Sequence, residues 1–144
     1  MKLWDLINSD ISITVFSFVL GGVLVSWLSF SWQKRAQKHA VRLTFARELI
    51  GTYHDYIRFL RREEKINNEE EFDELHTEML SKSYMANIVF DKALGQKIRA
   101  LADKLQNCHQ LRKQGRLAKA EQCRTENAKY AQEVIEQMYK LLNG

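Results

Sequence analysis

The histidines and cysteines are the first residues to consider for chemistry, because they are the usual nucleophiles, proton carriers and soft metal ligands. The four histidines stand apart from one another, at positions 39, 54, 76 and 109. The nearest approach to a metal motif is Asp73-x-x-His76, a single i, i+3 pair. A di-metal helical bundle needs two Glu-x-x-His motifs and two further glutamates on facing helices. We therefore expect no metal site and no cofactor.

No motif for catalysis is recognisable in the rest of the chain. His54 and Asp55 are neighbours beside aromatic positions, and a solvent-exposed pair is favoured over a buried one. A glycine-rich phosphate loop, a nucleophile elbow and an H-E-x-x-H motif are all missing from the sequence. Its basic clusters lack the motif context of a nucleic-acid-binding protein. The sequence thus predicts a protein that is not an enzyme, with no small-molecule substrate and no nucleic-acid partner.

The two cysteines are placed to meet if the last part of the chain forms a helical hairpin. Cys108 and Cys123 lie about equally far from Gly115, so an antiparallel hairpin brings them to a similar height. In the cytoplasm they are expected to be reduced thiols packed as small apolar groups, whereas outside the cell a disulfide is expected.

The elements that position these residues are predicted to be helices only. The chain of 144 residues has no proline and six glycines, so little in it interrupts a helix. Asn68 and Asp91 are good N-cap residues, and Gly115 marks a turn. Residues 33–144 are therefore expected to form an up-and-down helical bundle, with a first turn near Lys65 and approximate helices at 33–62, 68–88, 91–113 and 116–142.

A long uncharged stretch, residues 11–32, precedes this bundle. Its 22 residues make a helix of roughly 33 Å, enough to cross a hydrocarbon core of about 30 Å. The leader has one lysine against Asp5 and Asp10, and no small-residue cleavage site follows, so a retained anchor is favoured over a signal peptide. We expect an all-α chain in which a single N-terminal transmembrane helix continues into the bundle.

The basic residues after this stretch predict its orientation. On the positive-inside rule, the bundle is cytoplasmic and residues 1–10 are extracytoplasmic, as in a single-pass protein of a bacterial inner membrane. Trp4 is expected near the outer boundary. An inner-leaflet contact with membrane lipid is predicted for the residues at the other boundary, although a stop-transfer and orientation signal is favoured as the explanation of their charges. These residues are Trp32, Lys34, Arg35, Lys38 and Arg42.

Small residues form two stripes along the predicted membrane helix. Such stripes let helices approach closely in a bilayer, although glycine and serine are also common in membrane spans without this role. Their members, the predicted helix-packing residues, are Thr14, Ser17 and Gly21 on one stripe and Gly22, Ser26 and Ser29 on the other.

Three functions remain open. The favoured one is a non-catalytic, membrane-anchored helical interaction module, which forms a homo-oligomer or serves as an accessory or scaffold subunit bound to another membrane protein. The alternative is a membrane effector of the bacterial defence or toxin type, whose spans assemble to permeabilise the bilayer. An enzyme with an unrecognised site is the third, and no constellation of residues points to it.

Overall fold

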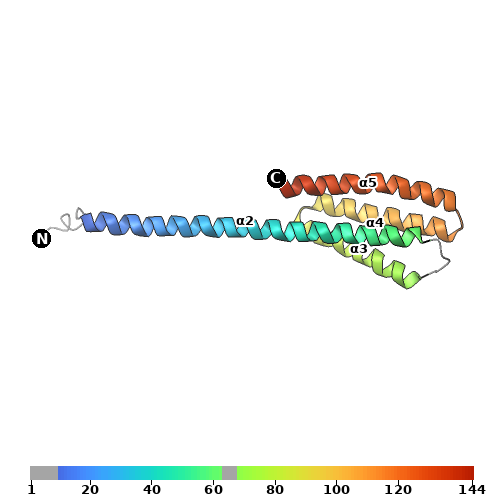
Figure 1. Ribbon diagram of the computed structural model, residues 1–144, viewed down its shortest axis with the longest axis horizontal. Helices are drawn as coiled ribbons and strands as arrows, with labels where there is room; N and C mark the ends of the chain where they lie inside the picture. The colour runs from blue at the N-terminus through green and yellow to red at the C-terminus, as the bar shows by residue number, and fades with distance from the viewer. Residues whose placement is uncertain (1–9, 63–67) are drawn as a thin grey trace. The chain divides into compact units, whose positions relative to one another are not determined.

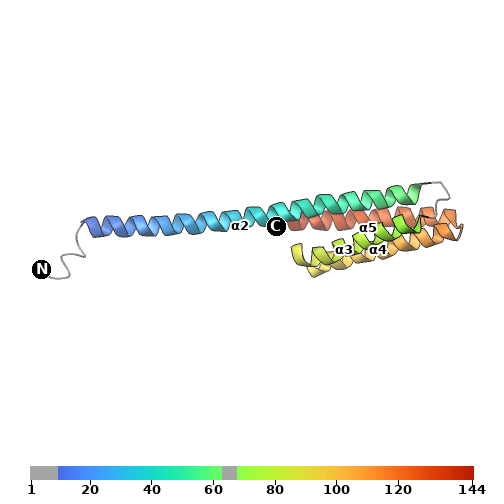
Figure 2. The same ribbon diagram turned by 90° about the horizontal axis from the view of Figure 1, so that it is seen from below.

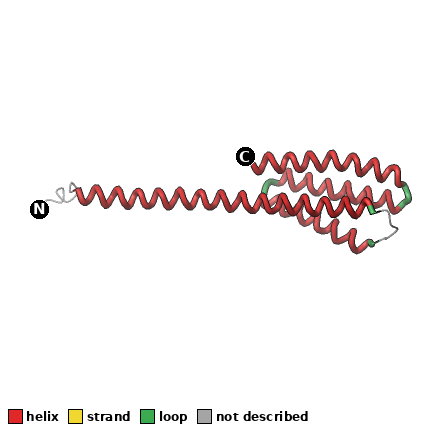
Figure 3. Tube along the Cα trace, viewed as in Figure 1, coloured by secondary structure: helices red, strands yellow, loops and turns green. Residues whose placement is uncertain are grey.

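The computed structural model describes residues 10–62 and 68–144, and it describes the side chains of all of these except 10–16. The described residues form helices joined by short turns (Figure 3), so the predicted all-α class is confirmed. The helices are α2 (Asp10–Arg61), α3 (Glu69–Val89), α4 (Lys92–Lys113) and α5 (Leu117–Asn143). The last three have ends within one residue of those predicted from the sequence.

Helix α2 is a single element of 52 residues, and Gly51 lies inside it without interrupting it. The chain divides into two compact units, Met1–Ala40 and Val41–Gly144, and the last two fifths of α2 belong to the second unit. Two predicted features lie outside the described residues. They are the turn near Lys65 and most of the outer segment 1–10, including Trp4.

The prediction of a transmembrane helix finds no support in the structure. In the part of the chain that the structure describes, no helix has both the length and the apolar content that a membrane crossing requires. The side chains of residues 11–16, with which the predicted span 11–32 begins, lie outside that part. The span therefore stays a prediction from the sequence.

The second unit is a bundle in which residues 41–61 of α2 pack with α3, α4 and α5, each helix running opposite to the one before it (Figures 1 and 2). Every helix contributes large buried side chains to one core. The largest fully buried ones are Tyr56 from α2, Met79 from α3, Leu94, Ile98 and Leu105 from α4, and Val134 and Met138 from α5. These positions recur at steps of three, four or seven within a helix, as a buried helical face requires.

The helix ends follow from local hydrogen bonds. The Asn68 side chain accepts a hydrogen bond from the backbone N–H of Glu71, and the Asp91 side chain accepts one from that of Leu94, so both predicted N-caps are confirmed. Gly115 has φ +73°, a left-handed conformation that costs glycine little, and it ends α4 as predicted.

Helices α3 and α4 approach each other closely at Gly95. A Cβ atom added there would lie 1.9 Å from the Asn87 side chain and 2.7 Å from the backbone oxygen of Ser83. The backbone oxygen cannot move aside as a side chain can, so glycine is required at this crossing.

Candidate functional site

The first unit carries a long, exposed apolar surface on α2. Between residues 18 and 32, ten large hydrophobic side chains are exposed, from 49% for Leu20 to 85% for Phe18. They occupy runs of consecutive positions, such as 18–20 and 23–25, and successive residues of a helix point about 100° apart. The surface is therefore apolar on all sides of the helix, unlike the one-sided pattern of a helix that covers a core.

The predicted helix-packing residues lie within this surface. Ser17, Gly21, Gly22, Ser26 and Ser29 are all exposed, whereas the side chain of Thr14 lies outside the described part of the chain. A Cβ atom added at Gly21 or Gly22 would meet no described atom within 4 Å. No contact within the described chain therefore explains these two glycines.

The predicted inner-leaflet residues fall into two groups. Trp32, Lys34, Arg35 and Lys38 are exposed, and Trp32 is 76% exposed. Their positions are compatible with a lipid contact, which nothing in the structure tests. Arg42 differs, because it belongs to the bundle and is partly buried.

Arg42 joins the C-terminal ends of two other helices. Its Nε donates a hydrogen bond to the backbone oxygen of Val89 at 3.1 Å, and its Nη1 donates one to that of Leu141 at 2.9 Å. Its guanidinium carbon also lies 5.1 Å from the centre of the Phe90 ring. Because helix C-terminal ends carry partial negative charge, a cation between two of them is stabilising. The sequence predicted a lipid contact for this residue and gave no sign of these partners.

The other end of the bundle contains an aromatic–histidine cluster, formed by Tyr56, Phe59, Phe72, His76 and His109. The ring of Phe72 stacks on that of His109, with centroids 4.0 Å apart, and on that of His76 at 5.7 Å. Tyr56 is completely buried, and its hydroxyl has no hydrogen-bond partner among the described residues. Burial raises the pKa of this hydroxyl above its ordinary value.

The imidazole of His109 is the central polar group of this cluster. It is 6% exposed, and burial lowers its pKa despite the Glu69 carboxylate 3.7 Å from its Nε2. That carboxylate pairs more closely with Lys113, at 2.7 Å, which lowers the pKa of Glu69. The sequence contained a signal for this buried histidine, because it follows Leu105 by four residues on the apolar face of α4.

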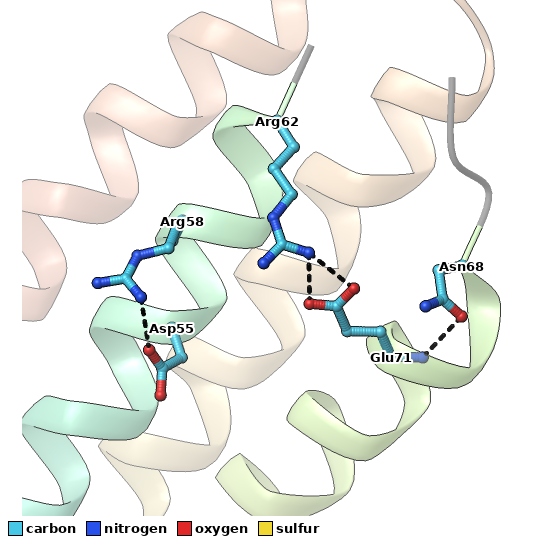
Figure 4. Close-up of polar contacts among 5 residues, drawn as sticks. All are labelled: Asp55, Arg58, Arg62, Asn68 and Glu71. Carbon is cyan, nitrogen blue, oxygen red and sulfur yellow. Dashed lines mark hydrogen bonds and ion pairs between the residues drawn. The ribbon is translucent and has the colours of Figure 1, made fainter. Parts of the chain in front are cut away.

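A polar groove of about 270 Å³ lies between α2 and α3. Its charged groups are largely paired with each other (Figure 4). Arg62 donates from one nitrogen to both oxygens of Glu71, at 2.7 and 2.9 Å, and Arg58 lies 3.7 Å from Asp55. Glu78 accepts a hydrogen bond from the Thr52 hydroxyl at 2.7 Å. The contacts of Arg62 with Glu71 and of Thr52 with Glu78 join this end of α2 to α3, whereas the pair of Arg58 and Asp55 lies within α2.

The remaining candidates for chemistry are the cysteines and the Asp73-x-x-His76 pair. Cys108 and Cys123 do face one another across α4 and α5, with their sulfur atoms 2.7 Å apart. Asp73 is exposed, and His76 stacks on Phe72. Among the described residues, no three histidine, cysteine or acidic side chains are grouped so as to hold a metal ion.

No protein-family model, curated protein or solved structure matches this chain. Its function is therefore inferred from its own residues.

Proposed function

We propose that this chain is a non-catalytic, membrane-anchored interaction module, with residues 11–32 as a single membrane span and residues 33–144 as a cytoplasmic helical domain. It forms a homo-oligomer or serves as an accessory or scaffold subunit of a larger membrane complex. The observation that carries this proposal is the apolar surface on all sides of α2 between residues 18 and 32.

The free energy of this surface in water argues for a covering of lipid. Burying one large apolar side chain is favourable by about 1.5–3 kcal/mol, so ten of them favour a non-aqueous environment by roughly 15 kcal/mol or more. One partner helix covers one side of a helix, whereas lipid covers all of them. Residues 11–32 carry no charged side chain, which matches the low polarity of a bilayer interior.

The charges around the segment support the orientation. Lys34, Arg35 and Lys38 are exposed directly after it and carry the excess of positive charge expected on the cytoplasmic side. Trp32, at the boundary, has the amphipathic ring that favours the headgroup layer.

Two features support an interaction role. Gly21 and Gly22 are free of contacts within the described chain, so a second helix can approach the backbone there. In the bundle, four charged groups of the groove between α2 and α3 form two ion pairs, Arg62 with Glu71 and Arg58 with Asp55.

Insertion is tested with the full chain and liposomes that contain brominated lipids. Tryptophan occurs only at positions 4, 27 and 32, so its emission reports on the N-terminal segment alone. We expect a blue shift and quenching by bromine. Leu24→Arg places a charge in the middle of the segment, at a cost of about 2.5–3.5 kcal/mol, and should weaken quenching. Leu117→Arg is the matched control, because Leu117 is 65% exposed in the bundle. Equal emission with and without lipid would refute the anchor.

Association is tested by native mass spectrometry of the mildly extracted complex. A homo-oligomer that dissociates with Gly22→Leu but not with Val23→Leu would support self-association through the small-residue stripe. Co-purification of a different membrane protein would identify an accessory subunit, and a monomer would exclude both. Dye release from liposomes, lost with Gly22→Leu, would instead favour the membrane effector.

A further inference from the structure

Cys108 and Cys123 form a close pair that the proposed function does not use. Cys108 lies on α4 and Cys123 on α5, on the two sides of the turn at Gly115. Their sulfur atoms lie 2.7 Å apart, and a disulfide has an S–S bond of about 2.05 Å. Both are free thiols. The two sulfur atoms are therefore already close to bonding distance.

The surroundings of the pair hold both sulfur atoms in place. Asn127, itself 3% exposed, donates from its Nδ2 to the sulfur of Cys108 at 3.0 Å and lies 3.7 Å from that of Cys123. The Asn107 amide nitrogen lies 4.0 Å from the sulfur of Cys123. The buried Asn127 amide therefore lies within reach of both sulfur atoms, at the contact of α4 with α5.

The two thiols differ in access. Cys108 is 2% exposed, and burial raises its pKa to about 12, so it is a poor nucleophile on its own. Cys123 is partly exposed and is the sulfur that a small molecule reaches first. This asymmetry gives one thiol the role of attacking the oxidant and the other the role of completing the disulfide.

We propose that Cys108 and Cys123 are a redox-modification site, at which a small peroxide converts the two thiols into a disulfide that links α4 to α5. The inference is independent of the membrane anchor, because both cysteines belong to the second unit.

The chemistry balances with hydrogen peroxide as the oxidant. The Cys123 thiol attacks one peroxide oxygen, the O–O bond breaks, and the products are a sulfenic acid and one water. The Cys108 sulfur then attacks the Cys123 sulfur, the S–O bond breaks, and the hydroxyl leaves as a second water with the proton of Cys108. Two thiols are oxidised by two electrons in total, and one peroxide is reduced. A dithiol reductant reverses the change.

The test uses the full chain in detergent micelles, reduced, desalted and treated with one equivalent of hydrogen peroxide in the presence of dimedone. Free thiols are then alkylated in denaturant, and the intact mass is measured. We expect a product that has lost two hydrogen atoms and carries neither dimedone nor alkyl groups. Because the thiols are pre-oriented, the ratio of disulfide to dimedone adduct should be at least about tenfold higher than for the same chain in urea.

Two variants assign the roles. Cys108→Ser should accumulate the dimedone adduct at Cys123, whereas Cys123→Ser should react several times more slowly. A folded chain whose two thiols are still alkylated after peroxide treatment would overturn the proposal. So would disulfides that only join two chains, or a disulfide-to-adduct ratio that is the same in urea.

Discussion

Replacing Arg42 with alanine should destabilise the bundle, and the magnitude can be worked from its contacts. The side chain makes two charged hydrogen bonds to backbone oxygens, at 2.9 and 3.1 Å, and lies over the Phe90 ring. Hydrogen bonds to charged groups contribute about 1.5–3 kcal/mol each, and a partly exposed cation–π contact about 0.5–1 kcal/mol. The site is partly exposed, so water can replace some of these partners. A loss of about 2–3 kcal/mol is therefore expected.

The same residue has a competing interpretation as a lipid contact, and the two interpretations predict different results. A lysine or arginine near an anionic leaflet contributes about 1 kcal/mol of membrane affinity and nothing to domain stability. Arg42→Lys keeps the charge but cannot donate to two carbonyl groups in a fixed geometry. It should therefore preserve lipid affinity while restoring less than half of the stability lost in Arg42→Ala.

The assay is urea unfolding of the full chain in detergent micelles. Alkylation of Cys108 reports on the bundle, because this thiol is 2% exposed when the bundle is folded. In thermal unfolding, the loss corresponds to a melting temperature lower by roughly 10–15 °C. Lys38→Ala is the matched control, since Lys38 is exposed in the same basic cluster. Equal stability of Arg42→Ala and the unmodified chain would refute the role as a link between α3 and α5.

Three further predictions concern the bundle and use the same assay. Gly95→Ala should cost about 1–3 kcal/mol, because its Cβ would lie 2.7 Å from the Ser83 oxygen; an unchanged stability would mean that α3 and α4 separate easily. Tyr56→Phe should raise stability by about 1 kcal/mol, because it removes a buried hydroxyl without a partner among the described residues; a loss would reveal a partner for that hydroxyl. The pKa of His109 is lowered in the folded chain, so the unfolded chain takes up a proton first as the pH falls. The free energy of unfolding should therefore decrease as the pH drops below about 6.5, the ordinary pKa of histidine. His109→Gln should abolish the contribution of this residue to that pH dependence.

Local rules of the sequence predicted the helices well. Asn68 and Asp91 are strong N-cap residues, and Gly115 supplies a positive φ angle, so three helix ends followed from single residues. The facing of Cys108 and Cys123 followed from their nearly equal distances along the chain from that turn. Caps and turns depend on residues that are close together in the chain, so the sequence alone is enough to predict them.

Contacts between distant residues were not predictable in this way. Arg42 lies 47 residues from Val89 and 99 from Leu141, and its charge alone gave the same signal as the lysines before it. The stacking of His109 on Phe72 depends on how α3 is rotated about its own axis relative to α4, and no local sequence pattern specifies that rotation. The membrane helix stays a prediction, because the first part of the span lies outside the described side chains.

The position of α4 in the bundle has a consequence for how freely this sequence can change. Helix α4 meets α3 closely at Gly95, meets α5 through Cys108, and contacts α2 through Arg112, which donates to the backbone oxygen of Leu60. Eight of its 22 residues are buried, so more than a third of its positions are constrained by packing. The outer faces of α3 and α5 have fewer such constraints. Substitutions among homologous sequences should therefore accumulate on those faces, and the buried positions of α4 should change most slowly.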